Sequence, residues 1–102
     1  MEPTAAVELV AARDWQRWSE QNDAVIIDVR EPAEWARGTL PGSTLVSLGS
    51  IPGYLDDLDR DQAVLIVCRT AQRSAAAAQF MVRHGFNHVA NLMGGLVALG
   101  LA

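Results

Sequence analysis

Residues 64–78 read VLIVCRTAQRSAAAA and contain the only cysteine of the chain, Cys68. Four apolar residues, three of them β-branched, precede the cysteine, which is typical of a strand buried on both faces of a parallel sheet. The alanine-rich residues 74–84 predict a helix, and Gly85 is a typical residue to end it. The stretch therefore predicts a strand, a short loop and a helix, with Cys68 at the carboxyl end of the strand.

The rest of the chain repeats this alternation of strand and helix. A second apolar run, AVIIDV at residues 24–29, predicts another fully buried strand. Shorter strands are expected at residues 7–10, 44–46 and 89–92. Helices are expected at residues 11–20, 32–37 and 96–101, and a weak one at 49–58 that Pro52 and Gly53 interrupt. The pattern predicts an α/β fold, with a mostly parallel central sheet of about five strands and helices on both faces.

Length and composition indicate one globular domain, which we expect to span residues 1–102. A single cysteine cannot form an internal disulfide, and no Cys/His spacing predicts a zinc site, so we expect no bound metal. A reducing compartment, the cytoplasm, is the natural location. The N-terminus lacks the pattern of a signal peptide, and the apolar C-terminus is shorter than the roughly 20 residues that cross a bilayer. No membrane partner is expected.

Charge is distributed unevenly along the sequence. The net charge is −4, yet all twelve acidic residues lie at or before Asp61. Beyond that point the chain carries Arg69, Arg73 and Arg83 and no acidic residue. The acidic total argues against a nucleic-acid partner, which needs a basic surface. A small anion bound near the locally cationic cysteine loop remains compatible with this distribution.

The position of Cys68 favours a reactive thiolate. Amides of a tight strand-to-helix loop can form an anion cradle, and the helix dipole adds to it. Arg69 and Arg73 act in the same direction. Asp28 and Arg30 end the other buried strand, at the same sheet edge, where an ion pair or a substrate contact is possible. From composition alone, Cys68 could instead be a small hydrophobic residue of the core.

Three segments of this chain resemble the rhodanese-like domains. Residues 26–48, IIDVREPAEWARGTLPGSTLVSL, are similar to the family's strand–helix–turn segment with its D-V-R-E motif. CRTAQRS at residues 68–74 resembles the active-site loop, commonly C-R-x-G-x-R-S. NLMGGLVALG at residues 91–100 resembles the closing segment. The resemblance covers about residues 24–101 in the family's order and spacing, and it implies the three-layer rhodanese-like fold.

The resemblance also implies a function. Cys68 would be the nucleophile of a sulfurtransferase, taking sulfane sulfur from thiosulfate or another donor and passing it on as a persulfide. The acceptor would be cyanide or a cellular thiol, such as thioredoxin or another sulfur-carrier protein, and no cofactor is implied. The loop would bind the anionic donor through Arg69, Thr70, Ala71, Gln72 and Arg73. Asp28, Arg30 and Ser74 would have structural roles near the site.

The sequence of the loop bears on two alternative functions, a phosphatase or arsenate reductase and a non-catalytic module. Related phosphatases and arsenate reductases of this fold have five residues between cysteine and arginine, whereas this chain has four, which favours sulfur over phosphate. Ala71 stands where glycine is usual in the family. This departure gives limited support to a non-catalytic binding or regulatory module. If residue 71 needs a positive φ, alanine costs about 1–2 kcal/mol there. Further departures occur at Thr39, Met93 and Leu99, where the family often has His, Glu and Trp.

Overall fold

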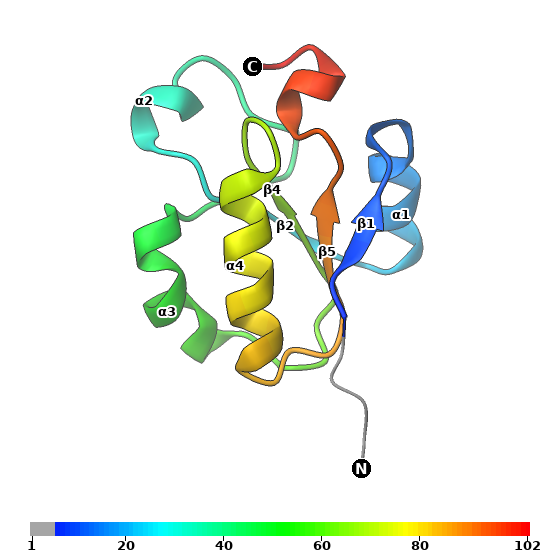
Figure 1. The fold of residues 1–102 in the computed structure, drawn as a ribbon, viewed down its shortest axis with the longest axis vertical. Helices are drawn as coiled ribbons and strands as arrows, with labels where there is room; N and C mark the ends of the chain where they lie inside the picture. The colour runs from blue at the N-terminus through cyan, green and yellow to red at the C-terminus, as the bar shows by residue number, and fades with distance from the viewer. Residues whose placement is uncertain (1–5) are drawn as a thin grey trace.

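The computed structural model describes residues 6–102 and contains one five-stranded sheet. The sheet lies at the centre of the fold, with helices around it (Figure 1). The strands run in the order β1-β5-β4-β2-β3, and all of them are parallel. Their bounds are β1 Glu8–Val10, β2 Val25–Asp28, β3 Thr44–Leu45, β4 Val64–Val67 and β5 Val89–Leu92. The α/β sheet expected from the sequence is confirmed.

Helices cover both faces of this sheet. The α-helices are α1 (Trp15–Gln21), α2 (Pro32–Trp35), α3 (Ile51–Tyr54) and α4 (Gln72–Arg83), and the 3-10 helices are η1 (Ala12–Asp14), η2 (Leu48–Ser50), η3 (Leu55–Asp57) and η4 (Leu96–Leu99). On one face, buried residues of α3 and α4 pack with Ile27 and Ile66. On the other, α1 and η4 pack against Ile26 and Leu65. Alternate residues of one strand thus enter two separate cores.

Strand β4 is the most buried element of the fold. Each of its four side chains has 0% of its surface exposed, and alternate residues contribute to opposite cores. Burying one such aliphatic side chain is worth about 1.5–3 kcal/mol. This anchoring gives the residue after β4, Cys68, a fixed position at the sheet edge.

The helix boundaries differ from expectation in several places. The helix expected at residues 11–20 is divided into η1 and α1, and the one expected at residues 32–37 ends at Trp35. Helix α4 begins at Gln72 rather than Ser74, because Ala71 caps it in a left-handed conformation. The interruption expected at Pro52 and Gly53 was wrong, since both lie inside α3 and Pro52 sits in the first turn, where its missing N–H breaks no helical bond. The last helix is a 3-10 turn that ends before Gly100.

The topology brings two strand ends together. Strands β2 and β4 are neighbours, with Asp28 in register with Val67, so Cys68 follows directly beside the end of β2. Ligand sites of open α/β sheets lie at this carboxyl edge. None of the helices in residues 6–102 is long and apolar enough to cross a bilayer.

Candidate active site

Cys68 is a free and fully buried thiol at the carboxyl end of β4. The backbone N–H of Ser74 donates to its Sγ at 3.3 Å, and the Ser74 hydroxyl lies 3.2 Å from the same atom. The carbonyl oxygen of Cys68 accepts a bond of 2.8 Å from the amide of Leu96. The first turn of α4 thus holds the sulfur, and the start of η4 holds the backbone of Cys68.

The loop between Cys68 and α4 turns at Ala71, which has φ 75° and ψ 0°. The positive φ considered in the sequence analysis is therefore present, and a residue with a Cβ is strained there by about 1 kcal/mol. Two hydrogen bonds hold the Ala71 carbonyl oxygen in place, one from the backbone of Ala75 at 3.1 Å and one from Asn91 Nδ2 at 3.2 Å. These bonds fix the orientation of the peptide group that follows Ala71.

The glycine pair before η4 permits close packing against this loop. A Cβ added at Gly95 would fall on the carbonyl of Arg69 and lie 2.7 Å from the carbonyl oxygen of Cys68. Gly95 also has φ 68°, which side chains rarely adopt. The amide of Val97 then donates to the Arg69 carbonyl oxygen at 3.1 Å. Any larger residue at position 95 would push the C-terminal segment off the loop.

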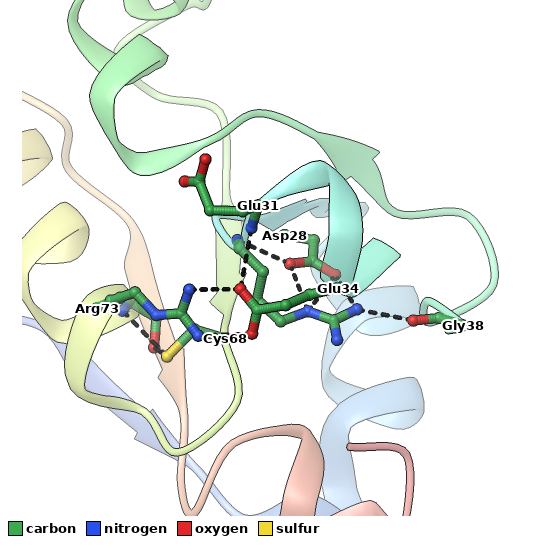
Figure 2. A network of polar contacts seen from close by, with 8 residues as sticks. Asp28, Glu31, Glu34, Gly38, Cys68 and Arg73 are labelled. Carbon is green, nitrogen blue, oxygen red and sulfur yellow. Dashed lines mark hydrogen bonds and ion pairs between the residues drawn. The ribbon is translucent and has the colours of Figure 1, made fainter. Parts of the chain in front are cut away.

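Arg73 makes an ion pair with Glu34 of α2 (Figure 2). Its two terminal nitrogens donate to the two carboxylate oxygens at 2.7 and 2.8 Å. The hydrogen bond from Arg73 lowers the pKa of Glu34 from 4.5 to about 2, against the opposing effect of burial, and Glu34 raises the pKa of Arg73 in return. The same carboxylate accepts the backbone N–H of Glu31 at 3.1 Å, so it caps α2 and holds α4 at once.

Asp28 and Arg30 form a second, deeply buried pair. Arg30 donates to the Asp28 carboxylate through Nε and through Nη2, the latter at 2.8 Å, and Nη2 also donates to the carbonyl oxygen of Gly38 at 2.7 Å. Of the two roles considered for these residues in the sequence analysis, the structure shows the ion pair. With 0% and 2% of their surfaces exposed, these side chains are occupied in holding the turn that follows β2.

The remaining candidate residues of the loop face outward. Arg69, Thr70 and Gln72 are exposed, and Ala71 is half-buried. Within residues 6–102, the Arg69 guanidinium has no ion-pair or hydrogen-bond partner, in contrast to Arg73. The residues that the structure describes contain no group of three or more His, Cys, Asp and Glu placed to hold a metal ion.

Two residues at the site were not singled out by the sequence analysis. Glu34 follows Glu31 by three residues at the start of a helix, a spacing that indicates a capping role but not a partner on α4. Asn91 is the polar residue of the otherwise apolar strand VANL, and it is buried. A buried amide inside a strand needs hydrogen-bond partners, and this was the signal available in the sequence.

Comparison with known proteins identifies the family. The model of the rhodanese-like domain matches residues 11–101. The chain belongs to the rhodanese-like domain family. It is 34% identical over 83 residues to a sulfurtransferase of Allochromatium vinosum, covering 81% of this chain and 78% of that protein. It is also 34% identical over 79 residues to the thiosulfate sulfurtransferase GlpE of Pseudoalteromonas translucida, covering 78% of this chain and 75% of that protein.

A solved structure agrees with the family assignment. The crystal structure of a rhodanese-like domain protein from Staphylococcus aureus superposes with a TM-score of 0.80 at 27% identity and covers 90% of both chains. The rhodanese-like fold expected from the resemblance is confirmed. The relatives named sulfurtransferases support a rhodanese-type sulfurtransferase as the general activity of this protein.

Proposed function

We propose that the protein is a rhodanese-type sulfurtransferase that carries sulfur as a persulfide on Cys68, with thiosulfate or a similar anion as donor. The observation that carries the proposal is the placement of Cys68 Sγ at the carboxyl edge of the sheet, against the backbone N–H of Ser74 in the first turn of α4. A helix N-terminus and its free amides favour negative charge on a nearby sulfur. The relatives named sulfurtransferases support the same activity.

The reaction would proceed in two displacements. The Cys68 thiolate attacks the outer sulfur of thiosulfate, the sulfur–sulfur bond of the donor breaks, and sulfite leaves with the bonding electron pair. Cyanide or the thiolate of an acceptor then attacks the outer sulfur of the Cys68 persulfide. The bond between Cys68 Sγ and the outer sulfur breaks, thiocyanate or an acceptor persulfide leaves, and the Cys68 thiolate is restored. Neither step requires a metal or a cofactor.

The two loop arginines would divide the work of binding the donor. Arg69 is exposed and unpaired among the described residues, so its guanidinium is available to the sulfonate oxygens of thiosulfate. Arg73 acts electrostatically on Cys68, but its side chain donates its hydrogen bonds to Glu34. We therefore assign donor recognition chiefly to Arg69, with the backbone of Thr70, Ala71 and Gln72 completing the loop.

The loop length weighs against the phosphatase alternative, because four residues between Cys68 and Arg73 leave less room for a tetrahedral oxyanion than five. A non-catalytic rhodanese-like module is the second candidate. The strained Ala71 and the complete burial of Cys68 favour it. We further propose that residues 1–102 act as a single domain in the cytoplasm, where a lone cysteine stays reduced. Thioredoxin or another sulfur-carrier protein would be a suitable acceptor there.

One experiment separates these functions. The protein is incubated with thiosulfate and cyanide, thiocyanate is followed, and Cys68→Ser is the control. We expect thiocyanate from the wild type alone, and intact-mass analysis with thiosulfate alone should show the mass of one added sulfur atom. Arg69→Gln should raise KM for thiosulfate about tenfold, as loss of a charge-assisted hydrogen bond implies. Equal inactivity of wild type and Cys68→Ser, without persulfide, refutes the proposal, and hydrolysis of an aryl phosphate would favour the phosphatase.

A further inference from the structure

Behind Cys68 lies a chain of hydrogen bonds that the two displacements do not use. The hydroxyl oxygen of Ser74 lies 3.2 Å from Cys68 Sγ and 2.6 Å from Oδ1 of Asn91. The amide nitrogen Nδ2 of Asn91 lies 3.2 Å from the carbonyl oxygen of Ala71. Cys68 and Ser74 are completely buried and Asn91 is 5% exposed. Water therefore competes little for these bonds, and each group depends on its protein partners.

The direction of each bond follows from which atoms carry hydrogen. The Ala71 carbonyl can only accept, so the Asn91 amide must turn its Nδ2 toward it and its Oδ1 toward Ser74. Oδ1 can also only accept, so the Ser74 hydroxyl donates to it. A hydroxyl has one hydrogen, which leaves the Ser74 oxygen as an acceptor toward the sulfur. In this arrangement the hydroxyl hydrogen is directed away from the sulfur, so a hydrogen bond between the two side chains uses the S–H of Cys68 as donor.

We propose that Asn91 is a positioning residue that controls the ionisation of Cys68 through the Ser74 hydroxyl. While Ser74 donates to Asn91, the sulfur keeps its hydrogen. When the S–H bond breaks and its proton passes to water, the hydroxyl turns from Asn91 to the thiolate and donates there. A charge-assisted bond of this kind is stronger than the neutral one it replaces. Asn91 and the thiolate compete for the same hydroxyl hydrogen, so Asn91 disfavours formation of the thiolate until this exchange occurs.

Charged groups surround Cys68 on the loop and on three neighbouring elements. They are Arg69 on the loop, Arg73 at the start of α4, Glu31 and Glu34 at the start of α2, and Asp28 and Arg30 at the end of β2. Strand β5 and η4 contribute no ionisable residue. A substitution at position 91 therefore leaves every one of these charges in place, and a change in the pH dependence of the sulfur reports on the hydrogen-bond chain.

Alkylation by iodoacetamide, a neutral reagent, measures this directly because Cys68 is the only cysteine. The rate is followed by intact mass from pH 5 to 10. Asn91→Leu removes the competing acceptor, so the pH of half-maximal rate should fall by about 0.5–1 unit, the value of one hydrogen bond. Ser74→Ala removes the donor, and this pH should rise. In the Ser74→Ala background, Asn91→Leu should have no further effect, because the hydroxyl that links the two residues is gone.

A merely structural role for Asn91 predicts a different result. Loss of Asn91 would then alter the pH dependence of alkylation to the same extent with and without the Ser74 hydroxyl. This outcome would overturn the proposal. An unchanged pH profile in Asn91→Leu, or a shift to higher pH, would overturn it as well. Asn91→Asp gives the opposite sign, since a carboxylate accepts from Ser74 and also opposes a second negative charge.

A second measurement avoids position 91 altogether, in case its variants fold poorly by circular dichroism. The infrared S–H band of the wild type should lie at lower frequency than that of Ser74→Ala, because the wild-type thiol donates a hydrogen bond. An unmoved band refutes the assigned direction. Only the catalytic meaning of this arrangement rests on the proposed function. Alkylation and infrared spectra need no sulfur donor, so both can be measured even if the thiocyanate assay fails. In the same way, the thiocyanate assay still tests the proposed function if the hydrogen-bond proposal fails.

Discussion

Two arginine–carboxylate pairs support the cysteine loop, and they differ in almost every physical respect. Asp28 and Arg30 are two residues apart, fully buried and closed by five hydrogen bonds that include a carbonyl of the following turn. Glu34 and Arg73 are 39 residues apart, and their side chains keep 26% and 35% of their surface exposed. The first pair shapes one turn, whereas the second fastens one helix to another.

The difference in burial has an energetic consequence. Removing one partner of a buried pair leaves an uncompensated charge away from water, which is far more costly than losing the attraction itself. Removing one partner of a half-exposed pair allows water to solvate the other. Asp28–Arg30 should therefore be a condition of folding, while Glu34–Arg73 should adjust the position of α2 and the loop at moderate energetic cost.

Arg30→Met should produce the largest effect on stability. It leaves the buried Asp28 carboxylate without its partner, and we expect the free energy of unfolding to fall by about 3–5 kcal/mol. Urea denaturation followed by circular dichroism measures the loss. Arg30→Lys keeps the charge but not the forked geometry, so it should lose less and serves as the folded control. A loss below about 1 kcal/mol in Arg30→Met, a value expected of exposed pairs, would contradict this account.

Glu34→Gln should produce a smaller effect that depends on pH. We expect a loss of about 1 kcal/mol at pH 7, because the bidentate pair is strong in geometry but open to water. Since folding lowers the pKa of Glu34 from 4.5 to about 2, the contribution of this carboxylate is complete above pH 4.5 and is lost as the pH falls toward 2. The stability difference between wild type and Glu34→Gln should shrink over that range.

Urea denaturation of both proteins between pH 2 and 7 checks this prediction, with Glu31→Gln as the matched control. Glu31 is the N-cap of α2, and a Gln side chain there keeps the oxygen that accepts the Glu34 backbone N–H of the capping box. The Glu31 side chain makes no salt bridge within residues 6–102. A difference between wild type and Glu34→Gln that stays constant down to pH 2 would show that the Glu34 carboxylate gains nothing from Arg73.

The same contrast explains what the sequence could predict. The strands, the sheet edge that holds Cys68 and the Asp28–Arg30 pair depend on apolar runs or on residues close together in the chain, and all of these were predicted. The Glu34–Arg73 pair was not, because twelve acidic residues were equally available as partners for Arg73. Only the folded sheet brings the start of α2 against the start of α4.

The hydrogen-bond chain behind the sulfur was beyond prediction for a related reason. Ser74 was expected near the site, yet its bond to Asn91 joins residues 17 apart on α4 and β5. The start of α4 also depended on the backbone of one residue, Ala71, whose left-handed conformation alanine does not favour. Sequence patterns give average preferences, and a strained turn held by tertiary hydrogen bonds overrides them.

Ala71→Gly should have the smallest effect and should sharpen the comparison of the two pairs. Glycine accepts φ 75° without strain, so we expect the free energy of unfolding to rise by about 0.5–1 kcal/mol. The Ala71 carbonyl is held by Ala75 and Asn91 rather than by the Glu34–Arg73 pair. The gain should therefore be the same in the Glu34→Gln background, within about 0.5 kcal/mol. Urea denaturation of the two single variants and the double variant tests this additivity. If the gain in the free energy of unfolding doubles or disappears in the Glu34→Gln background, the half-exposed Glu34–Arg73 pair imposes the strained turn at Ala71. The pair would then shape the loop around Cys68 in addition to joining α2 to α4.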